Sequence, residues 1–200
     1  MEKFKPTLIV IAGPNGSGKT SITNQILKHE WLANCIYINP DIIAQEELGS
    51  WNNSENIVRA ANLAAERRLK CIHNNESLIF ETVFSALDKI DFLMLAKEKE
   101  YFIRLFFVGT DNPTINASRV AMRVIEGGHD VPISKIVSRY TKSISNCCFV
   151  STFVDRIYVY DNSTDFETAK LLFRAVNGVL EISYNEINKW AMPIFESLKK

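Results

Sequence analysis

Apolar runs and segments of helical periodicity alternate along the whole chain. Five apolar runs predict strands that are buried on both faces of a sheet, at residues 7–13, 35–39, 77–84, 101–110 and 156–163. Between them, apolar residues recur at helical spacing over residues 18–28, 54–73, 113–127 and 132–152, and a further helix is expected after Asp88. Because alternating strands and helices build parallel sheets with helices on both faces, this pattern predicts an α/β fold with a five-stranded parallel sheet.

The C-terminal segment has a different pattern. Asn177 and Gly178 separate two alternating runs, which is a strong signal for a β-hairpin, and a last helix is expected over about residues 186–198. No repeat, low-complexity segment or linker interrupts the sequence. We therefore expect a single domain over residues 1–200, with the hairpin and the last helix forming its C-terminal part over about residues 168–200.

The charges of the chain balance, with 23 Lys and Arg against 23 Asp and Glu. Domains that bind nucleic acid usually carry a basic excess, so a polynucleotide partner is disfavoured. The four cysteines lack the paired C-x-x-C spacing of zinc sites, which is typical of reduced thiols in a reducing compartment. No apolar stretch reaches membrane-spanning length. We expect a cytoplasmic protein without a membrane partner.

A phosphate-binding loop follows the first apolar run. The stretch GPNGSGKT fits the Walker A pattern G-x-x-x-x-G-K-S/T and stands between a predicted strand and a predicted helix, as this motif requires. Its glycines let backbone N–H groups surround a phosphate, and the helix N-terminus adds a favourable dipole. Lys19 is expected to neutralise the β- and γ-phosphates of ATP, and the Thr20 hydroxyl to bind Mg²⁺. The predicted ATP-binding residues are Gly13, Pro14, Asn15, Gly16, Ser17, Gly18, Lys19, Thr20 and Ser21.

The loop leaves three classes of protein open: a GTPase switch, a mechanical ATPase and a kinase. The guanine-binding motif N-K-x-D is missing, because the Asn-Lys pair at Asn188 is not followed by the aspartate. The L-S-G-G-Q signature of transport ATPases is also missing. Asp161 stands where a Walker B aspartate would stand, but Asn162 follows it rather than a catalytic acid. These features favour the kinase.

Two carboxylates follow predicted strands, at the sheet edge where ligands of open α/β folds bind. Asp41, in the stretch INPD, suits a general base that accepts the proton of an acceptor hydroxyl, and it suits equally an N-cap of the helix after Pro40. Glu81, in the stretch FETVFS, is a charged group in an apolar strand and therefore needs a partner. A metal ion or a substrate hydroxyl would supply one, with Thr82 as a second contact, and so would an arginine of a neighbouring helix.

Arg119 and Arg123 are candidates for contacts to the transferring phosphate. They are four residues apart and share one face of the helix that starts at Pro113. Small kinases commonly bring such charges onto the γ-phosphate by closing a helical lid. The Gly127-Gly128 pair is a hinge between this helix and the next, so we expect a lid over about residues 113–150.

The helix after the hinge carries a second basic stripe. Lys135, Arg139 and Lys142 recur at helical spacing. A stripe of charge is usually a solvated face, and we interpret Lys135 and Lys142 in this way, whereas the role of Arg139 stays open. His129, at the tip of the hinge, is interpreted as structural or solvated.

The ordered motifs GPNGSGKT, INPD, FETVFS, RVAMRVIEGGHDVP, RY and YDNS, over about residues 8–163, resemble the zeta toxin family of P-loop kinases. The family has a kinase-like α/β fold, and its best-known members phosphorylate a sugar hydroxyl of UDP-N-acetylglucosamine, which poisons bacterial wall synthesis. The resemblance implies that Asp41 is the general base, that Lys19 and the loop bind ATP, and that Thr20 shares Mg²⁺. It also implies a lid arginine at Arg119 or Arg123, and a substrate groove along Asn39, Asp41, Glu81 and Thr82.

One departure from the family pattern concerns the lid. The better-known members carry a further arginine before the lid proline, where this chain reads GGHDVP with His129 near the matching place. The charge on the γ-phosphate would then come from Arg119, Arg123 or Arg139, and the acceptor need not be UDP-N-acetylglucosamine.

The leading hypothesis is thus an ATP- and Mg²⁺-dependent kinase for a small-molecule hydroxyl such as that of a UDP-sugar, with an antitoxin protein as a candidate partner. One alternative is an ATP-binding regulator that has no metabolite acceptor. Another is a P-loop kinase for a different hydroxyl, on a nucleoside, an antibiotic or a polynucleotide end.

Overall fold

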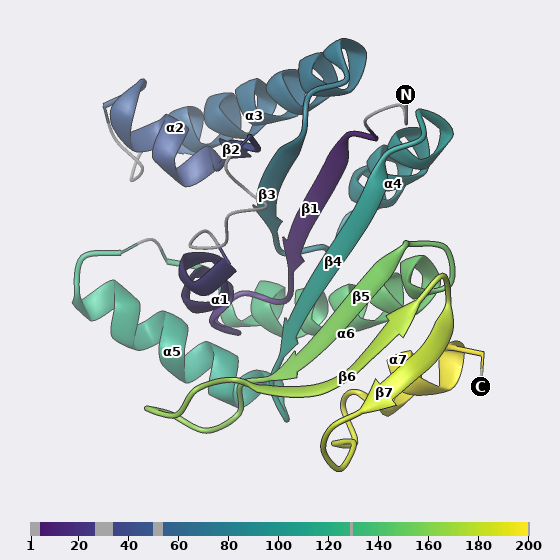
Figure 1. The fold of residues 1–200 in the computed structure, drawn as a ribbon. Coiled ribbons are helices and arrows are strands. Elements are labelled where there is room, and N and C mark those ends of the chain that lie inside the picture. The colour runs from purple at the N-terminus through teal and green to yellow at the C-terminus, as the bar shows by residue number, and fades with distance from the viewer. Residues whose placement is uncertain (1–4, 27–33, 50–53, 129, 200) are drawn as a thin grey trace.

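A seven-stranded sheet forms the centre of the molecule, in the order β2-β3-β1-β4-β5-β6-β7 (Figure 1). The computed structural model describes residues 5–26, 34–49, 54–128 and 130–199. The strands are β1 (Thr7–Ala12), β2 (Ile36–Ile38), β3 (Leu78–Thr82), β4 (Phe102–Gly109), β5 (Arg156–Asp161), β6 (Lys170–Val176) and β7 (Val179–Ser183).

The first five strands run parallel, which confirms the predicted α/β fold and its parallel sheet. The predicted width of five strands is wrong, because the C-terminal hairpin continues the same sheet. Strand β6 pairs antiparallel with β5, and β7 pairs antiparallel with β6. The pairing satisfies the backbone groups that β5 would otherwise leave open at the sheet edge.

Seven helices surround the sheet in the described part of the chain. They are α1 (Lys19–Ile26), α2 (Pro40–Glu46), α3 (Ser54–Asn74), α4 (Asp88–Glu98), α5 (Pro113–Ile125), α6 (Ile133–Ser151) and α7 (Met192–Ser197). Helix α7 is shorter than the range predicted for it. Pro193 lies in its first turn, and a helix that continued through this proline from residue 186 would lose a backbone hydrogen bond and meet the pyrrolidine ring.

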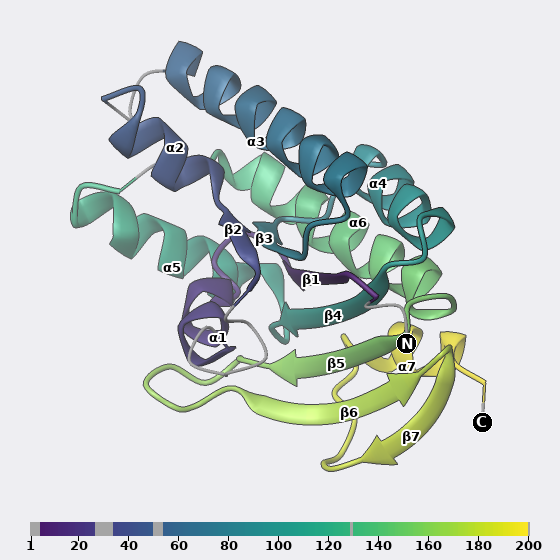
Figure 2. The ribbon, with the colours of Figure 1, turned by 45° about the horizontal axis from the view of Figure 1, so that its top comes forward.

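Side chains of β1 alternate between two cores on opposite faces of the sheet. Val10 belongs to the larger core, to which α3, α4, α6 and α7 contribute. Ile9 and Ile11 belong to a smaller core, in which Ile22 of α1 packs. Figure 2 shows α1 on one side of the sheet and α3, α4 and α6 on the other. The segment between β1 and α1 therefore crosses the sheet edge at the carboxyl ends of the parallel strands.

Helices α5 and α6 differ in how they are anchored. The buried residues of α5 and of the start of α6 form a small core of their own, with Val120, Val131 and Ile136 at its centre. Further along α6, Tyr140 and Cys147 belong to the main core. Helix α6 is thus fixed to the sheet, whereas α5 packs chiefly on Val131 and the start of α6.

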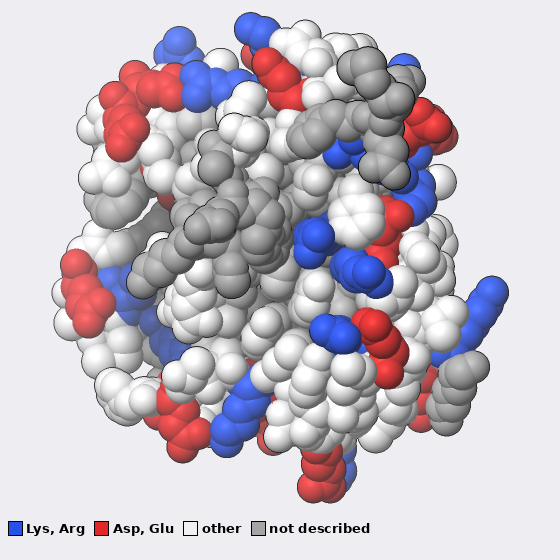
Figure 3. All heavy atoms as spheres, in the orientation of Figure 1, with Lys and Arg blue, Asp and Glu red and all other residues white. Residues whose placement is uncertain are grey.

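On the face drawn in Figure 3, basic and acidic side chains are interspersed, in keeping with the balanced composition. None of the described helices is long and apolar enough to cross a membrane.

Candidate functional site

The Walker A segment forms a tight loop between β1 and α1. Gly13 has φ 149° and Gly18 has φ 88°, which side chains rarely allow. A Cβ atom on Gly13 would lie 2.1 Å from the carbonyl oxygen of Val108, and one on Gly18 would lie 2.1 Å from Nδ2 of Asn162. Glycine is therefore needed at both positions for the loop to approach β4 and β5.

Two asparagines from distant elements hold the loop in place. Asn162 follows β5 and donates a hydrogen bond from Nδ2 to the carbonyl oxygen of Ser17, at 2.8 Å. Asn116 of α5 is buried and donates from Nδ2 to the carbonyl oxygen of Asn15. Neither residue was a predicted site residue. Asn116 shares the buried face of α5 with Val120, one turn further on, and a polar residue at such a position was the signal available in the sequence.

Lys19 lies at the centre of the candidate site. Its ammonium group donates to the carbonyl oxygens of Gly13 and Pro14, at 2.9 and 3.0 Å. Burial lowers the Lys19 pKa to about 8, and the nearby charge of Arg123 lowers it as well. The carboxylates of Glu81 and Asp41 act in the opposite direction and raise this pKa. Lys19 thus lies close enough to three other predicted residues, Glu81, Arg123 and Asp41, to interact with their charges.

The strand register explains why Glu81 reaches the loop. Glu81 pairs with Ile11 in the sheet, and both belong to the face that α1 covers. The hydroxyl of Thr20, on the first turn of α1, lies 3.5 Å from Oε2 of Glu81. Tyr37 pairs with Ile79, two residues before Glu81, so its ring lies on the same face of the sheet.

Tyr37 connects Glu81 with the start of α2. Its hydroxyl donates to Oε1 of Glu81 at 2.7 Å and accepts a hydrogen bond from Nδ2 of Asn39 at 2.9 Å. Burial and the charge of Glu81 raise the Tyr37 pKa, so the hydroxyl keeps its proton at neutral pH. Tyr37 was not a predicted site residue.

The start of α2 tests one of the two roles that the sequence allows for Asp41, that of a helix N-cap. The N-cap of α2 is Asn39, whose Oδ1 accepts from the backbone N–H of Asp41 at 2.9 Å. Interpreting Asp41 as the N-cap is therefore wrong. Asp41 lies in the first turn of the helix, and its carboxylate is exposed.

Thr82 lies on the other face of the sheet from Glu81, because neighbouring residues of a strand point in opposite directions. Its hydroxyl accepts a hydrogen bond from the backbone N–H of Phe84 at 3.0 Å and so supports the turn after β3. The structure thus brings Glu81, but not Thr82, to the side of the sheet that holds Thr20.

The three arginine candidates have different surroundings. Arg119 binds Asp165 with its Nε and Nη2 atoms, at 2.8 and 2.6 Å, and its Nη1 atom donates to the carbonyl oxygen of Asn162 at 2.8 Å. Arg123 is the one whose charge acts on Lys19. Arg139 of α6 donates from Nη1 to Oδ1 of Asn15 at 3.3 Å. His129 lies outside the described residues.

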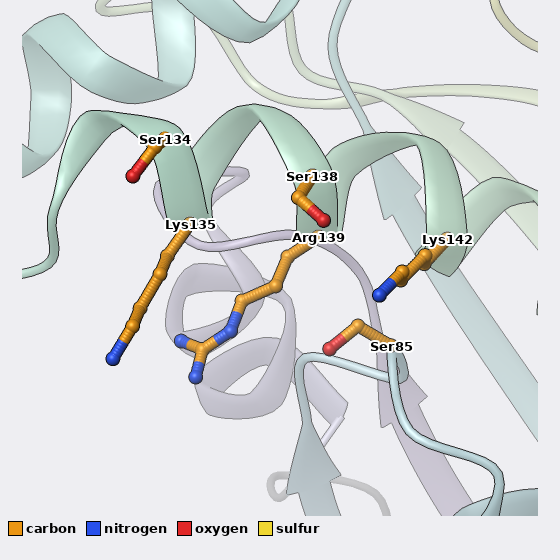
Figure 4. Close-up of a pocket in the computed structure, with 6 residues that line it drawn as sticks. All are labelled: Ser85, Ser134, Lys135, Ser138, Arg139 and Lys142. Carbon is orange, nitrogen blue, oxygen red and sulfur yellow. The ribbon is translucent and has the colours of Figure 1, made fainter.

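Two cavities adjoin the loop. The first, of about 460 Å³, lies between α1 and the segment after β5, where Ser21, Arg119 and Asn162 are among its lining residues. Phe166, which also lines it, is fully exposed. The second, of about 300 Å³, is lined in part by Lys135, Arg139 and Lys142 (Figure 4). Lys135 and Lys142 are exposed, as their interpretation as a solvated face predicts, and they also line this cavity.

The sheet order and the Walker A loop define a P-loop fold of the kinase type. Similar solved structures include a chain of the PezAT chromosomal toxin–antitoxin system of Streptococcus pneumoniae, with a TM-score of 0.67 and 17% identity over 100% of this chain and 80% of that one. A chain of the AvrRxo1-ORF1:ORF2 complex with ATP has a TM-score of 0.69 and 18% identity, and the match covers 97% of this chain and 63% of that one. A chain of the Pnkp1/Rnl/Hen1 RNA repair complex matches with a TM-score of 0.56 and 18% identity, over 72% of this chain and 46% of that one.

Residues 1–170 match the family model described as Zeta toxin. The chain therefore belongs to the zeta toxin family, as its motifs predicted. No curated protein sequence matches it significantly. At identities below one fifth, the solved structures establish the fold alone, and the chain spans less than two thirds of the AvrRxo1 chain that it matches.

Proposed function

We propose that the protein is an ATP- and Mg²⁺-dependent kinase that transfers the γ-phosphoryl group to a hydroxyl of a small molecule, such as the sugar of UDP-N-acetylglucosamine. The observation that carries the proposal is the chain of hydrogen bonds from Thr20 through Glu81 and Tyr37 to Asn39. It connects the loop expected to hold the phosphoryl donor with the helix that carries the expected base, Asp41. A regulator that only bound ATP would not need a general base at the position of Asp41.

In the proposed reaction, the acceptor oxygen attacks the γ-phosphorus while the bond from this phosphorus to the β–γ bridging oxygen breaks, and ADP leaves. The hydroxyl proton passes to the Asp41 carboxylate, which is exposed and therefore accessible to an acceptor. Lys19 and Arg123 offset the negative charge on the transferring group. The loop of residues 13–21 binds the phosphates, and the cavity beside Arg119 and Phe166 receives the base and ribose of ATP.

The residues around Thr20 fit a magnesium ion that is bound together with a nucleotide. Mg²⁺ in phosphoryl-transfer sites usually has one or two protein oxygen ligands and takes the rest from phosphate and water. The Thr20 hydroxyl and Oε2 of Glu81, which lie 3.5 Å apart, would be such ligands. In the described part of the chain, no group of three or more His, Cys, Asp or Glu side chains could hold a metal ion by itself. When bound, the ion would neutralise charge on the β- and γ-phosphates.

We further propose that residues 1–200 form one kinase domain, in which residues 113–150 act as its lid. The small core that α5 shares with the start of α6 supports a movement of α5 within this region, while Tyr140 and Cys147 hold the rest of α6 on the sheet. Because the PezAT relative belongs to a toxin–antitoxin system, we propose an antitoxin protein as a partner. A reaction that uses ATP as its donor is expected in the cytoplasm.

The test is to incubate the protein with γ-labelled ATP, Mg²⁺ and a panel of nucleotide sugars, free sugars and nucleosides, and to separate the products. We expect one new labelled species in the nucleotide-sugar samples. Binding of ATP without a labelled product from any sample would support the regulator instead.

A further inference from the structure

The segment that follows β7 returns to the carboxyl end of β4. Trp190, in this segment, is buried, and its ring lies against Gly109, the last residue of β4. A Cβ atom on Gly109 would lie 2.2 Å from the indole ring, so only glycine lets the ring approach the strand this closely. The match to the zeta toxin family model ends at residue 170. Trp190 therefore belongs to a part of the chain that the family model does not describe.

Trp190 is hydrogen-bonded to a buried carboxylate. Its indole N–H donates to Oδ1 of Asp161 at 2.8 Å, and the Ser163 hydroxyl donates to the same oxygen at 2.6 Å. Ser163 in turn accepts a hydrogen bond from the backbone N–H of Asp111, just beyond β4, at 2.8 Å. In the described ranges, no basic side chain forms an ion pair with Asp161. Because a buried carboxylate is costly without partners, Asp161 depends on the donors that Trp190 and Ser163 supply.

Asp161 points away from the expected magnesium position. It follows Val159 by two residues on β5, so the two side chains lie on the same face of the sheet. Val159 and Trp190 both belong to the larger core, whereas Glu81 and Thr20 lie on the face that α1 covers. Asp161 stands at the sequence position of a Walker B aspartate, but it lacks the orientation of a ligand for this magnesium ion.

The residue after Asp161 contacts the ATP loop. Asn162 donates from Nδ2 to the carbonyl oxygen of Ser17 at 2.8 Å, and its own carbonyl oxygen accepts from Arg119 at 2.8 Å. Its backbone N–H donates to the carbonyl oxygen of Gly109 at 2.9 Å. The turn of residues 161–163 is thus held by Trp190 on one face of the sheet, and it holds the loop and Arg119 at the sheet edge.

We propose that Asp161 and Trp190 are positioning residues of the ATP site. The indole N–H orients the Asp161 carboxylate, the carboxylate fixes the turn after β5, and the turn presents Asn162 to the loop and to Arg119. Trp190 itself does not line the cavity beside Arg119, so it acts on ATP affinity without touching the nucleotide. The proposal rests on the ATP-binding part of the proposed function.

Calorimetric titration with a non-hydrolysable ATP analogue and Mg²⁺ tests the proposal without requiring transfer. Trp190→Phe keeps an aromatic ring beside Gly109 but removes the N–H, so it should bind the analogue about tenfold more weakly. Phe195→Leu is the matched control, because Phe195 of α7 packs on Phe173 at the edge of the same core. This variant should bind the analogue like the wild type. Equal affinities of Trp190→Phe and the wild type, or equal losses in both variants, would overturn the proposal.

Asp161→Asn approaches the same contact from the other side and keeps the test available if Trp190→Phe does not fold. It should also weaken the analogue about tenfold, because a charged acceptor is lost. The double variant W190F/D161N should bind no more weakly than the weaker single variant, since both changes act through one hydrogen bond. The Mg²⁺ concentration for half-maximal binding of the analogue should stay the same in Asp161→Asn. Additive losses, or a tenfold higher requirement for Mg²⁺, would contradict the proposal.

A kinetic test uses the acceptor that the labelled panel identifies. Trp190→Phe should raise the KM for ATP about tenfold and leave kcat unchanged, because the indole acts on ATP binding and not on the transferring group. A lower kcat with an unchanged KM for ATP would overturn the positioning role. Weaker binding of the analogue by Trp190→Phe, in a protein that transfers phosphate to no acceptor, would keep this role and reject the kinase proposal.

Discussion

Replacing Tyr37 with phenylalanine removes one oxygen atom from the chain of hydrogen bonds between the ATP loop and α2. The lost hydroxyl donates to the Glu81 carboxylate at 2.7 Å and accepts from Asn39 at 2.9 Å. A hydrogen bond to a charged group contributes about 1.5–3 kcal/mol, and one between neutral groups about 0.5–1.5 kcal/mol. If the bond to Glu81 is needed to position this carboxylate in the transition state, the loss lowers kcat/KM by about ten- to a hundredfold.

The assay is steady-state phosphate transfer from labelled ATP, together with calorimetric titration of the ATP analogue. Tyr37→Phe should reduce transfer while the affinity for the analogue changes little, because the backbone of the loop and Lys19 are untouched. Tyr184→Phe is a matched control, since Tyr184 is an exposed tyrosine beyond β7. Transfer by Tyr37→Phe at the wild-type rate would show that Glu81 needs no such support and would refute the reasoning.

Two further predictions concern the ATP loop. Burial lowers the Lys19 pKa to about 8, so the lysine is charged below this pH and neutral above it. The affinity for ATP should therefore be constant below pH 8 and fall by up to about tenfold per pH unit above it. Calorimetric titration of ATP across this pH range measures the effect. Lys19→Arg keeps its charge, so its affinity should not change with pH. A wild-type affinity that is equally independent of pH would contradict the prediction. Arg119→Ala removes the bonds to Asp165 and to the carbonyl oxygen of Asn162. It should therefore raise the KM for ATP about tenfold with little change in kcat. Arg123→Ala, in contrast, should lower kcat. A fall of kcat alone in Arg119→Ala would show that Arg119 acts on the transferring phosphate.

The features that could be predicted from sequence are those that local chemistry determines. The Walker A loop needs glycines at fixed positions after a strand and before a helix, and residues 13–20 meet each requirement. The hairpin at Asn177-Gly178 was predictable for the same reason. Its attachment to the sheet was not, because pairing β6 with β5 depends on which sheet edge is free, and a local turn signal carries no information about that edge.

The predicted site shows the same limit. Glu81 was recognised because a charge in an apolar strand needs a partner, but the partner, Tyr37, is 44 residues away in sequence. The two meet only because β2 lies next to β3 rather than next to β1. Likewise, the spacing of Lys135, Arg139 and Lys142 shows that they share a face of a helix, but not that the segment after β3 closes a cavity over that face.

The central claim is that Asp41 removes a proton from the acceptor while the loop donates the phosphoryl group, and the most direct test is single-turnover transfer by Asp41→Asn. The variant keeps the size of the side chain and leaves the N-cap residue, Asn39, in place. With labelled ATP, Mg²⁺ and the acceptor found in the panel, we predict a rate about 10²–10⁴-fold below that of the wild type, with unchanged ATP affinity. Transfer by Asp41→Asn at close to the wild-type rate would contradict the account.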